Sequence, residues 1–136
     1  MLWVTRSHVD FCRAACSWLI ARFIDSDAQF IFVPQSEVLP LAEREGAIPF
    51  DVPGAGLYRQ GDLSTFEAIL RNYNLTDRAL LRMAKIVNAS ESGKPEKDPP
   101  AAGLEAIAVG YSVRYPDDLQ NLEHQFEVFD ALYAWC

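Results

Sequence analysis

The fold class is decided by residues 2–33, which read LWVTRSHVDFCRAACSWLIARFIDSDAQFIFV. Both ends of this stretch, Leu2–Thr5 and Gln29–Val33, are short runs rich in β-branched and aromatic residues, which favour strands. Pro34 closes the second run, and we expect that strand to be buried. Because the residues between the two runs keep a helical spacing, the chain is predicted to begin as strand, helix and strand.

The helix inside this stretch is expected to begin at Ser7, because Ser7 and Asp10 have the S-x-x-D spacing of a helix start. Apolar side chains then recur on one helix face, at Ala15, Trp18, Leu19 and Phe23. The helix should end near residues 25–27, where the sequence is Asp-Ser-Asp.

Most of the remaining chain is predicted to be helical. Further helices are expected at residues 36–45, 64–73, 76–89, 104–111 and from 116 onward. Gly46 should stop the first of these, which contains Pro40, and a capping box from Ser64 to Glu67 should open the second. The clearest periodicity is in the last helix, where apolar residues follow steps of three and four, at Leu119, Leu122, Phe126, Phe129 and Tyr133.

Two segments are predicted to be irregular. Ile48–Gly56 contains two prolines and two glycines and should form a shaped loop. Ser90–Pro100 contains three prolines and no apolar anchor, and it should be a mobile surface loop. The predicted class is therefore α+β and predominantly helical, with five or six helices and two or three short strands near the N-terminal half, in a single domain over residues 1–136.

Composition excludes several classes of protein. Half of the 136 residues are hydrophobic, which argues against a disordered chain, and no apolar run is long enough for a transmembrane helix. The formal net charge of −7 disfavours direct binding to nucleic acid or to an anionic membrane. The first residues lack the features of a secretory signal, and three cysteines are too few for a disulfide framework, so a cytoplasmic protein is expected.

Several segments together carry a specific resemblance to a known family. They are residues 3–6, 13–25, 30–34, 46–51, 86–87, 102–107 and 130–135. In this order they are similar to the chromate-resistance domain at the C-terminus of ChrB proteins. The resemblance covers nearly the whole chain and implies a role in chromate sensing and resistance. It also implies that the chain is an isolated domain, because ChrB-type proteins often carry an additional N-terminal region.

The chain departs from the family pattern where a metal or redox site would need ligands. Cys12 replaces an acid, and Arg59 replaces a histidine after the Pro-Gly loop. Ser64 replaces a cysteine, and Ser90 stands where an acid is expected after Ile-Val. Only Cys16 of that set remains, so the resemblance implies a degenerate site.

Three soft metal ligands lie four residues apart. His8, Cys12 and Cys16 would share one face of a helix that begins at Ser7, and such ligands suit zinc or another thiophilic metal. The two cysteines could also form a strained disulfide or a redox pair. The alternative is that they belong to the core, where cysteine is common. We therefore predict no cofactor and keep a metal as the less favoured alternative.

Three arginines could bind a tetrahedral anion. Guanidinium groups of Arg6, Arg13 and Arg59 suit the oxygens of chromate or sulfate, and the loop around Asp51 could add backbone N–H donors. Trp18 would form an apolar wall beside them. The predicted ligand-binding pocket is lined by Arg6, Arg13, Cys16, Asp51 and Arg59.

The alternative is that the same arginines are structural. Arg6 and Arg13 could form ion pairs with nearby acids, namely Asp10, Asp25 or Asp51. Near the C-terminus, Asp117 and Asp118 are expected to cap a helix, His124 to face solvent, and Asp130 to pair with a buried arginine.

Two functions follow from these patterns. The first is a non-catalytic module that senses or binds a small anion or a metal species. The second is a thiol- or metal-dependent redox enzyme that acts on chromate or a related oxidant, with Cys16 as its only candidate catalytic thiol. A regulatory protein partner is a third option, with the loop at Ser90–Pro100 and the aromatic C-terminus as its contacts.

Overall fold

A three-stranded parallel sheet organises the N-terminal half of the protein. The computed structural model describes residues 1–136 and places the strands in the order β2-β1-β3. The strands are β1 (Leu2–Arg6), β2 (Gln29–Val33) and β3 (Ile48–Pro49). β1 pairs in parallel with both neighbours, so it is the central strand and all three carboxyl ends point the same way.

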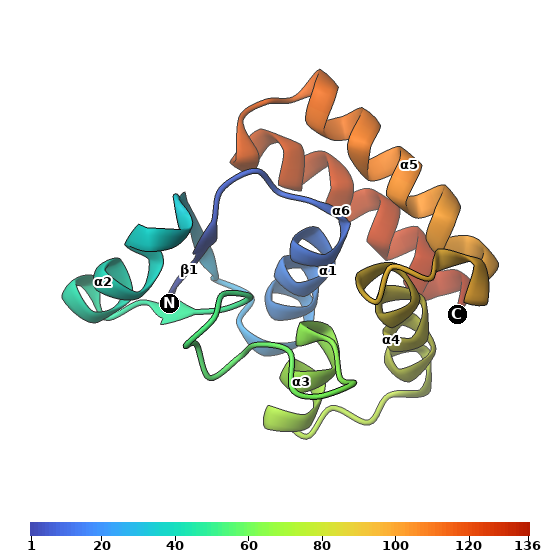
Figure 1. The fold of residues 1–136 in the computed structure, drawn as a ribbon, viewed down its shortest axis with the longest axis horizontal. Helices are drawn as coiled ribbons and strands as arrows, with labels where there is room; N and C mark the ends of the chain where they lie inside the picture. The colour runs from blue at the N-terminus through green and yellow to red at the C-terminus, as the bar shows by residue number, and fades with distance from the viewer.

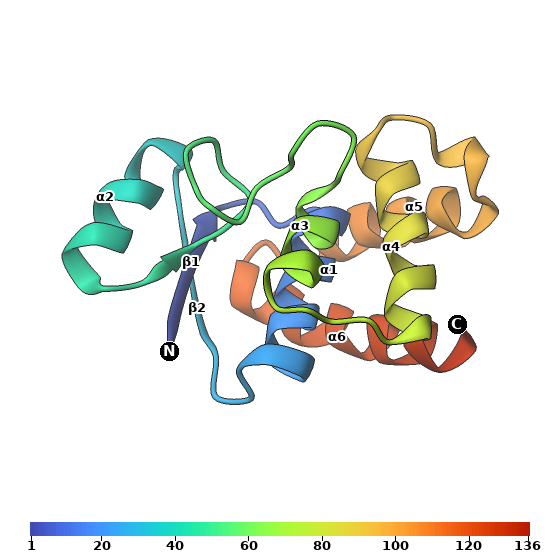
Figure 2. The same cartoon turned by 90° about the horizontal axis from the view of Figure 1, so that it is seen from below.

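Two helices cover opposite faces of this sheet. α1 (Phe11–Leu19) continues into the π-helical turn η1 (Ile20–Ile24) and connects β1 to β2. α2 (Gln35–Glu45) connects β2 to β3. Figure 2 shows α2, the sheet and α1 as successive layers. The first crossover runs from β1 to β2, and the second returns past β1 to β3, so the strand order reverses between β1 and β3.

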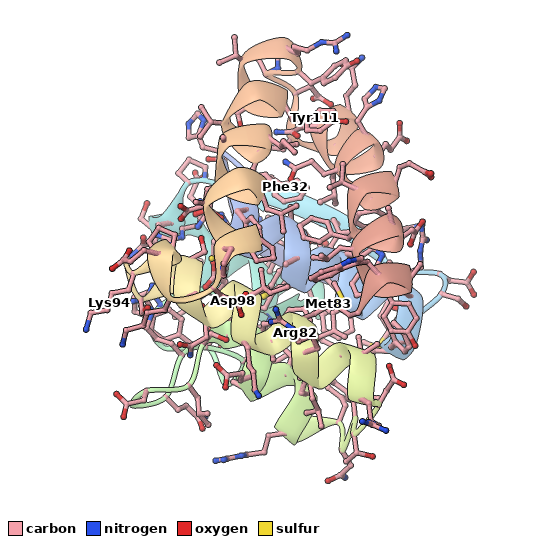
Figure 3. The ribbon with its side chains drawn as sticks, turned by 90° about the vertical axis from the view of Figure 1, so that its right-hand side faces the viewer. Phe32, Arg82, Met83, Lys94, Asp98 and Tyr111 are labelled. Atoms are coloured by element: carbon pink, nitrogen blue, oxygen red, sulfur yellow. The ribbon has the colours of Figure 1, made fainter.

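The other four helices pack around α1 on the side away from α2 (Figure 1). They are α3 (Thr65–Asn72), α4 (Arg78–Glu91), α5 (Pro99–Arg114) and α6 (Asp118–Trp135). Figure 3 shows Arg82 of α4 beside Asp98 at the start of α5, where Nη1 and Oδ2 are 2.6 Å apart. These six helices and three short strands confirm the predicted α+β, predominantly helical class. None of the helices combines the length and apolar character needed to cross a membrane.

The sheet separates two hydrophobic clusters. Alternation along β1 sends Trp3 into a cluster of 25 buried residues on the α1 side. Val4 points the other way, into a cluster of five residues beneath α2. The larger cluster draws side chains from α1, α3, α4, α5 and α6, so it fixes α1 against the helices that surround the candidate site.

Three local predictions were wrong for identifiable reasons. The first helix begins at Phe11 rather than Ser7, because Asp10 is its N-cap and accepts a hydrogen bond from the Arg13 backbone N–H at 2.9 Å. Ile48–Pro49, predicted to be irregular, forms β3 because it pairs with Trp3 and Val4. The strand Gln29–Val33 is only half-buried, because it lies at a sheet edge.

The segment Ser90–Pro100 also differs from its prediction as one exposed loop. Its first two residues belong to the last turn of α4, where Ser90 is buried. Pro95–Lys97 forms the 3-10 turn η2, and Pro99 begins α5. The predictions of a stop at Gly46 and a capping box between Ser64 and Glu67 are confirmed.

Candidate functional site

The candidate site lies at the carboxyl ends of β1 and β3. Arg6 is the last residue of β1, and Asp51 follows β3 with a left-handed backbone (φ 56°). In open sheets of parallel strands, ligands bind outside the carboxyl ends, where the strand order reverses. The strand topology alone therefore predicts a ligand-binding site at this edge of the sheet.

A buried ion pair forms the floor of the site. Arg13, in the first turn of α1, places Nη1 3.4 Å from Asp51 Oδ2. Its Nη2 donates to the His8 carbonyl at 2.9 Å and lies 3.3 Å from Asp10 Oδ2. Thr65 Oγ1 donates to the other Asp51 oxygen at 2.8 Å. Burial raises the pKa of Asp51, although Thr65 and Arg13 act in the opposite direction.

A cleft of about 910 Å³ lies over this ion pair. Its charged residues come from the end of β1, the β1–α1 connection, the segment after β3 and the end of α4. They include Arg6, Asp10, Asp51, Arg59 and Glu91. The opposite wall is an apolar stripe on α5, formed by Ala102, Ala106, Val109 and Val113. The cleft thus places charge against a hydrophobic wall.

Arg6 and Arg59 are the guanidinium groups that reach this cleft. Arg6 lies 3.9 Å from Asp51 Oδ2 through Nη2 and donates to Gln35 Oε1 at 3.3 Å through Nη1. Its Nε is buried and has no hydrogen-bond partner. Arg59 is about half exposed, and its Nε lies 3.3 Å from Glu91 Oε1.

Glu91, the last residue of α4, is a site residue that sequence reasoning missed. Its side chain is 8% exposed, and neither carboxylate oxygen accepts a hydrogen bond. Burial and then the charge on Asp51 raise the pKa of Glu91 to about 7, against the lowering influence of Arg59 and of the Thr65 backbone. The family pattern did call for an acid near this point, one residue earlier at Ser90.

The two N-terminal cysteines have different positions. Cys12 lines the cleft, whereas Cys16 is fully buried in the larger core cluster. Burial raises the pKa of both thiols well above the ordinary value. His8 lies before the helix with a left-handed backbone (φ 67°), so it does not share a helix face with the cysteines as predicted. No group of three or more His, Cys, Asp or Glu side chains in the structure could hold a metal ion.

The five residues predicted to share a pocket are therefore only partly brought together. Arg6, Asp51 and Arg59 line the cleft, and Arg13 lies beneath it as a structural ion-pair partner. Trp18 lies elsewhere, because five residues turn a helix by about 140° beyond a full turn from Arg13. Trp18 Nε1 instead donates to Asp130 Oδ1 at 2.7 Å.

The acids near the C-terminus have structural roles. Asp117 caps α6, as predicted, but Asp118 accepts the backbone N–H groups of His8 (3.1 Å) and Val9 (2.9 Å). Asp130 pairs with Arg22, which is 43% exposed rather than buried. His124 is exposed and stacks on Tyr115, with ring centroids 4.0 Å apart.

The fold and this cleft define an α+β domain with a charged site at the carboxyl edge of a small parallel sheet. The family model described as "ChrB, C-terminal domain" matches residues 3–136, so the chain belongs to the ChrB C-terminal domain family. It is 35% identical over 134 residues to Protein ChrB of Cupriavidus metallidurans. That match covers 97% of this chain but 40% of the relative. No solved structure matches the chain.

Proposed function

We propose that this ChrB-like domain binds a small tetrahedral oxyanion of the chromate class in the cleft, with Arg6 and Arg59 as the groups that hold it. The observation that carries the proposal is the buried and unpartnered Nε of Arg6 at the carboxyl edge of the sheet. A buried N–H donor without a partner is costly, and an anion oxygen would satisfy it. Guanidinium groups also match oxyanions in geometry and charge.

Arg13 fits the structural alternative, an ion pair with nearby acids, better than a ligand-binding role. Its two terminal nitrogens are engaged with Asp51, Asp10 and the His8 carbonyl. Its Nε, like that of Arg6, has no hydrogen-bond partner, but Arg13 does not line the cleft, so we infer that it shapes the floor rather than holding the ligand. In a longer ChrB protein, such a domain would be the part that senses the oxyanion.

The alternative of a thiol-dependent redox enzyme has weaker support. Its candidate catalytic thiol, Cys16, is fully buried in the core, and burial raises its pKa. Because the thiolate is the reactive form, these features favour binding over thiol chemistry.

Isothermal titration of the folded protein with chromate, phosphate and sulfate tests the proposal. We expect at least one of them to bind, and Arg6→Gln and Arg59→Gln each to weaken that binding by about tenfold or more, the value of a charge-assisted hydrogen bond. Arg44→Gln is the matched control, because Arg44 is an exposed arginine on α2 paired only with Glu45. The proposal fails if none of the anions binds, or if all three variants behave alike.

A further inference from the structure

Carboxylates outnumber arginines around the cleft, so its net charge does not favour anions. Arg6 and Arg59 line the cleft and Arg13 lies beneath it, whereas the carboxylates that line it are five: Asp10, Asp51, Glu91, Glu105 and Asp118. A dianion entering this site would therefore meet carboxylates as well as guanidinium groups. Binding by net charge alone does not account for such a site.

Glu91 is the carboxylate of the cleft that no hydrogen bond holds, and its close charged partner is Arg59, at 3.3 Å. Asp51 accepts from Thr65 and Arg13, and Asp10 accepts from the backbone of α1. Glu91 is more than nine-tenths buried, lines the cleft, and accepts no hydrogen bond at either oxygen. The site therefore offers a ligand two guanidinium groups and, on Glu91, a carboxylate that is ion-paired with Arg59 but accepts no hydrogen bond.

Resting on the oxyanion site proposed above, we propose that Glu91 is its specificity-determining residue and selects oxyanions that carry a proton, such as hydrogen chromate or hydrogen phosphate, over sulfate. The O–H of a protonated oxyanion donates to the Glu91 carboxylate while its other oxygens accept from Arg6 and Arg59. Sulfate has no proton to donate near neutral pH, so its oxygens would face the carboxylate lone pairs. Sulfate binding then requires Glu91 to take up a proton from solvent.

The surroundings of Glu91 place that proton uptake near neutral pH. The titratable and charged groups around it are Asp10 and Cys12 of the first helix and its cap, Asp51 and Arg59 after β3, and Glu105 of α5 across the cleft. Burial and Asp51 together raise the pKa of Glu91 to about 7, while Arg59 opposes the shift. In every favourable complex, one proton therefore lies between a Glu91 carboxylate oxygen and an oxygen of the ligand.

Phosphate and sulfate are the matched probes, because at about pH 8 both are mainly tetrahedral dianions and only phosphate carries a proton. By titration calorimetry we expect sulfate to bind the unmodified protein at least about tenfold more weakly than phosphate. Glu91→Gln should remove most of this difference, because the amide can donate to sulfate. Glu105→Gln is the control: it removes a carboxylate of the same cleft without removing the unpartnered acceptor, so the ratio should not change.

A second measurement needs no variant. In the unmodified protein, sulfate affinity should fall by about tenfold for each pH unit above 7, because Glu91 must then be protonated from solvent. Chromate affinity should also fall over this range, since the free anion loses its own proton. Equal binding of sulfate and phosphate, a selectivity unchanged in Glu91→Gln, or affinities independent of pH would each overturn this inference while leaving the oxyanion site intact. Failure of all three anions to bind would instead remove the proposed function.

Discussion

Arg13 and Asp51 are 6% and 2% exposed, and each supplies the charge that the other needs in the interior. Such a pair contributes little net stability, because burying both groups costs about as much as their attraction returns. Removing one member is different, because it leaves an uncompensated buried charge. The pair therefore holds the floor of the cleft in one arrangement.

Arg13→Met should lower the free energy of unfolding by about 3–5 kcal/mol, because it leaves the Asp51 carboxylate buried and unpaired. Urea denaturation measures this loss. The double variant Arg13→Met with Asp51→Asn should recover a large part of it. A single variant as stable as the parent would show that Arg13 is not a buried ion-pair partner.

Glu91 should make stability depend on pH. Its pKa is about 7 in the folded protein against an ordinary value of 4.5, so between these values the folded state binds more protons than the unfolded state. Stability should therefore fall as the pH rises from about 4.5 to 7, by about 3 kcal/mol. Denaturation curves of the parent and Glu91→Gln across this range isolate the effect, because only the parent has the Glu91 carboxyl group. Parallel curves would contradict it.

Among the structural elements, the start of α6 makes hydrogen bonds to a distant segment that helix capping does not explain. The Asp118 carboxylate accepts the backbone N–H groups of His8 and Val9 and thereby fixes the connection between β1 and α1. That connection lies between Arg6 and Arg13 in the sequence. A residue 110 positions away from His8 thus helps to shape the cleft.

Asp118→Ala should therefore weaken both stability and oxyanion binding. We expect a loss of about 1–3 kcal/mol, because two backbone donors lose their partner. Asp117→Ala is the matched control, since Asp117 only caps α6 through the Gln120 backbone N–H and should cost about 1 kcal/mol. Thermal denaturation and calorimetric titration of both variants separate the two roles. Equal binding by both would refute a role for Asp118 in the cleft.

Elements with local signals could be predicted from the sequence, and those that depend on distant partners could not. The capping box at Ser64 and the stop at Gly46 are short-range chemistry and are visible in the residues themselves. β3 has only two residues and exists because β1 pairs with it, which no local pattern reveals. The helix begins at Phe11 rather than at the predicted Ser7. Both Ser7 and Asp10 are residue types that cap helices well, and only the fold decides between them.

At the scale of the whole molecule, the site lies where the strand order reverses, because the first crossover runs from β1 to β2 and the second returns past β1 to β3. Arg6, Asp51 and Arg59 could be selected from the sequence because charged residues stand out after strands and in a Pro/Gly loop. Glu91 could not, because it ends a helix within a polar run and becomes buried only when α5 and the segment after β3 close around it. Cys16 lies in the core rather than in the cleft, which is the alternative that the sequence also allowed for that face of α1.

Because Cys16 lies in the core, the reactivity of its thiol should depend on unfolding of the protein. In native conditions a thiol reagent should reach Cys16 only through opening of the larger core cluster, so the Cys16 modification rate should rise with urea in parallel with unfolding. Mass spectrometry of labelled peptides resolves it from Cys136, which is only half-buried. Rapid native labelling of Cys16 would revive the thiol-dependent redox alternative.

A crystal structure of the protein soaked in chromate, with anomalous diffraction data that locate chromium, tests the central claim most directly. Our account predicts one anomalous peak in the cleft, with chromate oxygens in hydrogen-bonding reach of Arg6 and Arg59 and one oxygen facing Glu91. A fully occupied peak elsewhere on the protein, with none in the cleft, would contradict it.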